Sequence, residues 1–106
     1  MPEPTHTPAA HGDAPSRADL ERTFREEGLS PSWWSNGPLD RYSTHSHAYH
    51  KVLYCANGGI TFIVPGGASE FRLRPGDRLD IPPGVVHAAI VGPDGVTCVE
   101  AAKDAP

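Results

Sequence analysis

The sequence lacks long apolar segments, is poor in cysteine and carries no excess of basic charge. No run approaches the ~18 apolar residues of a membrane-spanning helix, so we expect no membrane partner. Nine basic against thirteen acidic residues give a formal net charge of −4. Because a nucleic-acid-binding surface needs clustered basic side chains, we also expect no nucleic-acid partner.

The two cysteines, Cys55 and Cys98, are too few for a disulfide scaffold. Both fall on apolar, β-rich runs, so we predict reduced, buried and unreactive thiols. The first fifteen residues show neither a cationic start nor an apolar stretch, and we expect no secretion signal there. These observations together predict a cytoplasmic protein.

A length of 106 residues corresponds to one domain. Residues 1–15 contain four prolines and no large apolar side chain. Such a segment buries too little surface to offset the entropy of ordering, so we predict a disordered tail. His6 and His11 lie in this tail, and we predict that both are solvated and without function.

Residues 16–40 are predicted to form a helix followed by a loop. The helix is expected over 17–27, because Ser16 suits the N-cap and Gly28 suits a left-handed stop. The loop contains two tryptophans, Trp33 and Trp34. We expect the indoles to pack the helix onto the main body; lining a ligand mouth or forming a dimer contact are the alternatives.

From residue 41 onward, short β-rich runs alternate with glycine and proline turn signals at near-regular spacing, which is typical of an all-β sandwich or barrel. A small sheet of this kind must close on itself or bury its edges, so we predict a barrel over 41–103 and a homodimer. The strands are expected near 41–46, 50–56, 60–64, 69–74, 78–81, 86–91 and 96–102, with turns at 57–59, 65–67, 74–77, 82–84 and 92–95.

Three of the six histidines cluster between residues 44 and 50. His45 and His47 are two residues apart, so on a strand both side chains point to the same face. Two imidazoles on one face can converge on a single cation. His50 is out of phase and is expected at the rim, although a β-bulge would swing it in as a fourth ligand.

A second pattern lies between residues 76 and 87, where glycine, proline, glycine and histidine follow one another in the order G-x5-P-x-G-x2-H. Together with the histidine pair, this pattern resembles the two motifs of the cupin family. The resemblance covers about residues 41–101. The matching positions are His45, His47, Gly58, Gly76, Pro82, Gly84 and His87.

The resemblance implies a double-stranded β-helix, which is a jelly-roll barrel. It also implies that His45, His47 and His87 reach into the interior and hold one divalent metal ion. Three neutral imidazoles with open positions suit Fe, Zn, Ni, Mn or Cu in a site that still admits a substrate.

The sequence departs from the cupin pattern at two positions. Lys51 stands where the family has a glutamate, and Val91 stands where it usually has an asparagine. An ammonium group close to a dication is electrostatically unfavourable. Three interpretations of Lys51 follow: it extends outward and leaves a three-histidine site, it points inward and binds a ligand carboxylate or phosphate, or it marks a barrel that has lost its metal.

The function that the resemblance implies is metal-dependent chemistry on a small anionic molecule, by a dioxygenase or an isomerase. Lys51 is the one candidate catalytic residue, and no general base can be named. The alternatives are a barrel that binds a small ligand without turnover and a structural barrel whose histidines are residual.

Overall fold

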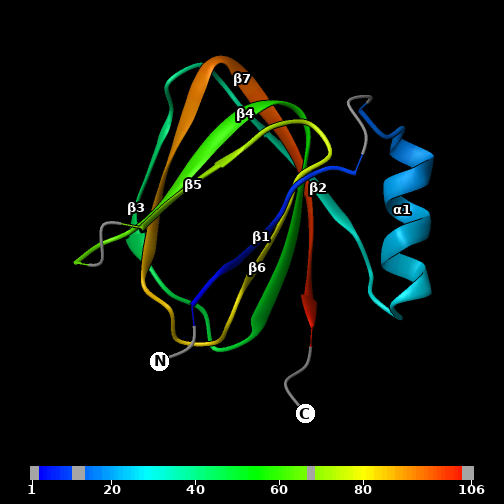
Figure 1. Ribbon diagram of the computed structural model, residues 1–106, viewed down its shortest axis with the longest axis horizontal. Coiled ribbons are helices and arrows are strands. Elements are labelled where there is room, and N and C mark those ends of the chain that lie inside the picture. Colours follow the sequence, from blue (N-terminus) through cyan, green and yellow to red (C-terminus); the bar gives the residue numbers. More distant parts are fainter. Residues whose placement is uncertain (1–2, 11–13, 67–68, 104–106) are drawn as a thin grey trace.

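The computed structural model describes residues 3–10, 14–66 and 69–103, and within them the chain forms one helix and seven strands (Figure 1). All strand pairings are antiparallel, which confirms the predicted all-β fold with a short N-terminal helix. The elements are β1 (Thr5–Thr7), α1 (Arg17–Glu26), β2 (Ser32–Asn36), β3 (Arg41–His45), β4 (His50–Val64), β5 (Ser69–Leu73), β6 (Arg78–Ile81) and β7 (His87–Lys103).

Two long strands, β4 and β7, pair along most of their lengths and bend together (Figure 1). The first half of β4 and the second half of β7 lie in one part of the sheet, which continues through β6 to β1 and, on the other side, to β2. The other halves of the two long strands pair with β5 and β3. The sheet thereby folds over on itself and encloses one core.

The bend occurs where the pairing of β4 with β7 loses its regular register, on either side of Gly58. Gly58 has a φ of +76°, and a Cβ built there would lie 2.1 Å from the carbonyl oxygen of Gly95. Only glycine permits this approach of two backbones. The turns predicted at 57–59 and 92–95 are therefore irregularities within continuous strands, so the four strands predicted on either side merge into two.

Alternate residues of β4 face opposite sides of the sheet. Leu53 and Cys55 lie in the enclosed core, whereas Val52 faces outward and packs against the helix. Cys98 of β7 is the register partner of Cys55, and both side chains are free, fully buried thiols, in agreement with the prediction. The enclosed core consists of Leu53, Cys55, Ile60, Phe62, Leu73, Leu79, Ile81, Ala89, Val91, Val96 and Cys98.

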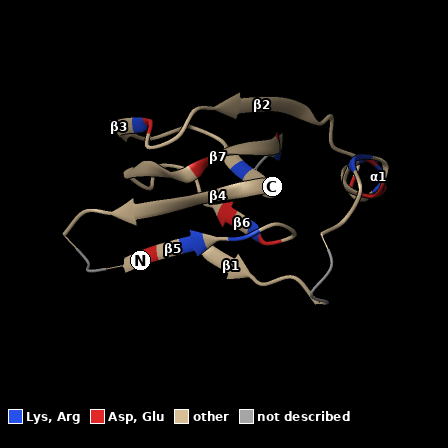
Figure 2. Cartoon of the chain, turned by 90° about the horizontal axis from the view of Figure 1, so that it is seen from above, with Lys and Arg blue, Asp and Glu red and all other residues tan. Residues whose placement is uncertain are grey.

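Helix α1 lies against the outer face of the sheet, and Figure 2 shows it to one side of the strands with charges of both signs around its turns. Ser16 and Asp19 form a reciprocal capping box at its start. The helix ends one residue before the predicted boundary and is followed by Gly28 at a φ of +75°. Leu20 and Phe24 are its buried residues and join the outer cluster.

Residues 32–36 form strand β2, so the prediction of a loop from the end of the helix to residue 40 is wrong over this segment. This segment pairs with the edge of β7, and its two tryptophans point to opposite faces. Trp33 packs in the outer cluster, donates its indole N–H to Glu21 at 2.8 Å and lies under the guanidinium of Arg17. Trp33 thus attaches the helix to the sheet as predicted, whereas Trp34 packs against the enclosed core.

Residues 5–7 form strand β1 along the edge of β6, where the sequence predicted a disordered tail. The buried carboxylate of Asp77 accepts the backbone N–H of Ala9 at 2.9 Å and lies 3.0 Å from Nε2 of His6. The contacts with Asp77 and the backbone pairing with the open edge of β6 order this segment, although it buries little apolar surface. His11 lies outside the described residues.

In the described part of the chain, no helix has the length and apolar character needed to cross a membrane. The sheet takes β1 and β2 from outside the predicted barrel limits of 41–103. The homodimer stays a prediction.

Candidate metal centre

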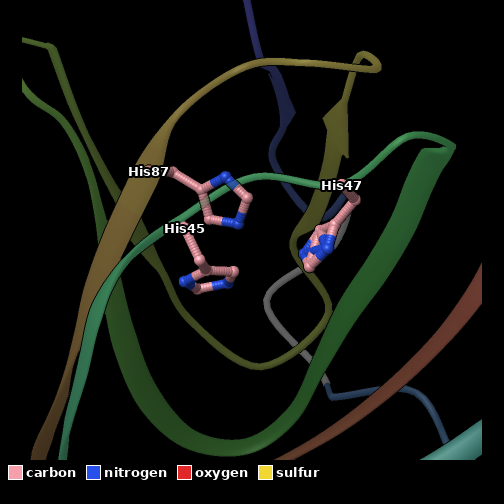
Figure 3. Close-up of side chains that lie close together, drawn as sticks. All are labelled: His45, His47 and His87. Carbon is pink, nitrogen blue, oxygen red and sulfur yellow. The ribbon is translucent and has the colours of Figure 1, made fainter.

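Three histidines from two separate segments of the chain lie close together (Figure 3). His45 is the last residue of β3, His47 lies in the link to β4, and His87 opens β7. His45 and His87 are register partners, with ring centroids 4.3 Å apart. The ring of His47 lies 5.0 Å from His45 and 5.1 Å from His87.

The backbone holds two of the rings in a defined orientation. Nδ1 of His45 lies 2.7 Å from the carbonyl oxygen of Ser43, and Nδ1 of His87 lies 2.9 Å from that of Val85. A carbonyl oxygen can only accept, so each Nδ1 carries the hydrogen and donates it. In both rings the lone pair therefore resides on Nε2, which is the arrangement that metal-ligating histidines adopt.

The residues present fit a metal ion. Nε2 of His47 and Nε2 of His87 are buried, and neither has a hydrogen-bond partner among the described residues. The ligand atoms of the three histidines all lie within 4.8 Å of one another. With metal–nitrogen bonds of about 2.1 Å, two ligands of one ion lie at most about 4.2 Å apart, so small rotations complete the site.

The electrostatics of the cluster favour neutral rings, which are the form that binds a metal. Burial lowers the pKa of both His47 and His87 below the usual histidine value, and the nearby Lys51 ammonium lowers it further. His87 is only 1% exposed. A proton on either ring would therefore be poorly solvated and close to another positive charge.

His50 does not join the cluster in this structure. Its Nε2 lies 2.8 Å from Oδ2 of Asp80 on β6. Asp80 also binds the Arg78 guanidinium at 2.6 Å, and Arg78 reaches Glu27 beyond the end of the helix. His50 is thus part of a hydrogen-bonded network with Asp80, Arg78 and Glu27 next to α1.

Lys51 points inward, because it shares the strand phase of the core residues Leu53 and Cys55. It is 9% exposed, and its Nζ lies 3.2 Å from Oε1 of Glu100 on β7. The same carboxylate oxygen accepts the indole N–H of Trp34 at 2.7 Å. Of the three interpretations of Lys51, the outward-pointing one is therefore wrong.

A cavity of about 230 Å³ is lined by the ion pair and by His45, one of the three clustered histidines. Its polar lining includes the hydroxyl of Tyr42, which donates to the side-chain oxygen of Asn36. Burial raises the pKa of Tyr42, so this phenol stays protonated at neutral pH. The lining residues are Trp34, Tyr42, His45, Lys51, Phe62 and Glu100.

Comparison with solved structures assigns the fold. A DUF861 family protein from Thermotoga maritima superposes with a TM-score of 0.66 at 14% identity, covering 95% of this chain and 100% of its own. An RmlC-like cupin from Shewanella frigidimarina gives a TM-score of 0.62 at 25% identity, covering 73% and 67%. The protein has a cupin fold.

A cupin-2 domain protein from the same Shewanella strain agrees, with a TM-score of 0.59, 16% identity and coverage of 69% and 68%. No family model and no curated protein matches the sequence. The cupin resemblance and the predicted double-stranded β-helix are therefore confirmed as a statement of fold.

Sequence reasoning missed Glu100 of the cavity and gave a ligand mouth for Trp34 only as an alternative. Glu100 lies two residues after Cys98, on the same face of β7, and this phase was available in the sequence. Trp34 could not be placed, because the segment around it was expected to be a loop. The register of β2 with β7 brings its indole to Glu100.

Proposed function

We propose that this cupin-fold protein binds one divalent transition metal ion through His45, His47 and His87, and uses the site to bind a small anionic molecule. The observation that carries the proposal is a pair of buried Nε2 atoms, on His47 and His87, that find no hydrogen-bond partner in the part of the chain that the structure describes and lie within a cluster of three imidazoles. A buried nitrogen without a partner is unfavourable unless a ligand completes it.

The ligand set supports the choice of an anionic substrate. Three neutral imidazoles leave the charge of a divalent ion uncompensated, and Lys51 and Glu100 cancel each other. A divalent ion there would supply Lewis acidity or, as iron, oxygen chemistry. We therefore propose a metal-dependent oxidoreductase of the dioxygenase type or an isomerase.

The protein's own residues would orient the substrate rather than exchange protons with it. The Tyr42 hydroxyl is engaged by Asn36, and the Glu100 carboxylate is engaged by Trp34 and Lys51. Within the described cavity lining no unengaged carboxylate stands ready as a general base. This observation favours a second candidate function, a barrel that binds a small ligand without turnover.

Elemental analysis of untagged protein, purified without chelators, tests the metal site. We expect about one transition metal ion per chain and its loss in His47→Ala. A wild-type protein that takes up no divalent ion, even after incubation with each candidate metal, would contradict the proposal. The identity of the metal then selects the activity assay, which is oxygen consumption for iron and isomerisation for zinc or manganese.

A further inference from the structure

Lys51 and Glu100 form an ion pair in the wall of the cavity that His45 also lines. Lys51 is the diagonal neighbour of Glu100 across β4 and β7, because Ala102 is the register partner of Lys51. Trp34 is the diagonal neighbour of Glu100 on the other side, across β7 and β2. Three adjacent strands thus place an ammonium, a carboxylate and an indole on one interior face.

The hydrogen bonding of this group is uneven. Both Trp34 and Lys51 bind the same oxygen, Oε1 of Glu100, at 2.7 and 3.2 Å. A lysine ammonium has three N–H donors, and the structure assigns one of them, to Glu100. Lys51 lines the cavity, as His45 does, so the ammonium that carries the other two N–H donors lies at the cavity wall.

A purely structural ion pair is a weak explanation for this arrangement. Burying two charges is costly, and apolar residues of similar volume often serve stability as well or better. The interior face of β4 is otherwise apolar at Leu53 and Cys55. The pair instead stands at the boundary between this core and the cavity, where an ammonium can contact a bound molecule.

We propose that Lys51 is the residue that recognises the carboxylate of a small chelating acid. In the unliganded protein Glu100 forms an ion pair with Lys51, and the bound carboxylate competes with Glu100 for the ammonium. The inference rests on the proposed function, because the other donor atoms of the acid would reach toward His45, His47 and His87. The indole of Trp34 holds Glu100 in place and forms a wall of the cavity. The substrate class is a small hydroxy, oxo or dicarboxylic acid that fits a cavity of about 230 Å³.

The two halves of the ion pair should respond in opposite directions. Lys51→Met removes the donor, and we expect the affinity for small acids to fall about 10- to 100-fold, the usual contribution of a charged hydrogen bond. Glu100→Gln removes the internal competitor, and we expect the affinity to rise several-fold. If the ion pair had only a structural role, acid binding would weaken in both variants.

The experiment is calorimetric titration of the metal-loaded protein with glycolate, lactate, oxalate and malonate, with lactamide and malonamide as neutral counterparts. Lys103→Met is the matched control, because Lys103 is an exposed lysine at the end of the same strand pair. The double variant Lys51→Met/Glu100→Gln is a second test of Lys51. It leaves no unpaired buried charge that could cause misfolding. We expect binding of acids but not amides, weakened about 10- to 100-fold in both Lys51 variants and unchanged in Lys103→Met.

The metal content of each variant separates this inference from the proposed function. We expect Lys51→Met to retain about one metal ion per chain, so that lost acid binding is not lost metal. If the wild type binds no metal, the metal-free protein is titrated, and weak acid binding that Lys51→Met abolishes would still support the role of Lys51. Equal binding to wild type and Lys51→Met, a parallel loss in Glu100→Gln, or no acid binding at all would overturn it.

Discussion

The backbone N–H of Gly84 donates a hydrogen bond of 2.8 Å to the carbonyl oxygen of His47. This bond ties the segment that carries His47 to the turn that leads into β7 and His87. The two histidine-bearing motifs lie far apart in the sequence. They are connected by this backbone hydrogen bond as well as by contacts between their imidazole rings. The cluster is held in place by the fold before any ion binds, which favours tight binding.

Metal binding should stabilise the folded protein. Zn²⁺ at about a hundredfold excess over its Kd is expected to raise the free energy of unfolding by about 2.7 kcal/mol, seen as a higher Tm that a chelator reverses. His87→Ala should lose this response. His50→Ala is the control and should keep it, because His50 contacts Asp80 instead. A response that survives in His87→Ala would place the ion elsewhere.

Gly58 should tolerate no side chain. Gly58→Ala places a Cβ 2.1 Å from the carbonyl oxygen of Gly95, so the bend of β4 must open. We expect a loss of about 3 kcal/mol or more in urea unfolding. Gly28→Ala is the matched control, since Gly28 has nearly the same φ, +75°, and nothing within 4 Å. It should lose about 1–2 kcal/mol. Similar losses in both would show that φ, not the close contact, is decisive.

Acid should destabilise the protein through Asp77 and Asp80. Burial raises the pKa of each carboxyl, but hydrogen bonds outweigh burial and hold it below its usual value. Because the unfolded state binds protons at higher pH, this stabilisation is complete above the unfolded pKa and is lost as the pH falls through the folded pKa.

Asp77→Asn measures how much the Asp77 carboxylate contributes to the free energy of unfolding. It removes an acceptor of the Ala9 and Arg74 backbone N–H groups, and we expect a loss of about 1–3 kcal/mol at neutral pH. The difference from wild type should shrink as the pH falls below the usual aspartate pKa, because the lowered pKa of Asp77 is then reached. Asp94→Asn, at an exposed position of β7, is the control and should leave the stability at neutral pH unchanged. A loss that stays constant with pH would assign the effect to packing.

The two thiols should be inert in the native protein. Contact with Cys55 and burial raise the pKa of the Cys98 thiol far above its usual range, and both side chains are fully buried. Ellman's reagent is therefore expected to label neither cysteine until urea unfolds the chain, when both should react. Rapid labelling under native conditions would mean that the β4–β7 pairing opens locally.

The sequence by itself determined the fold class and identified the three histidines of the candidate metal centre. Glycine and proline turns at regular spacing predicted a barrel, and the helix from Ser16 follows from a local capping box. His45, His47 and His87 were found because their motifs are local patterns. The inward orientation of Lys51 was also available, since its phase on β4 matches Leu53.

Tertiary structure alone decided which segments pair. β1 and β2 have weak strand signals, and they become strands because β6 and β7 offer open edges. The same pairing brings Trp34 and Lys51 to one oxygen of Glu100. Contacts of this kind depend on the register between strands far apart in the chain, and local residue patterns carry no record of that register.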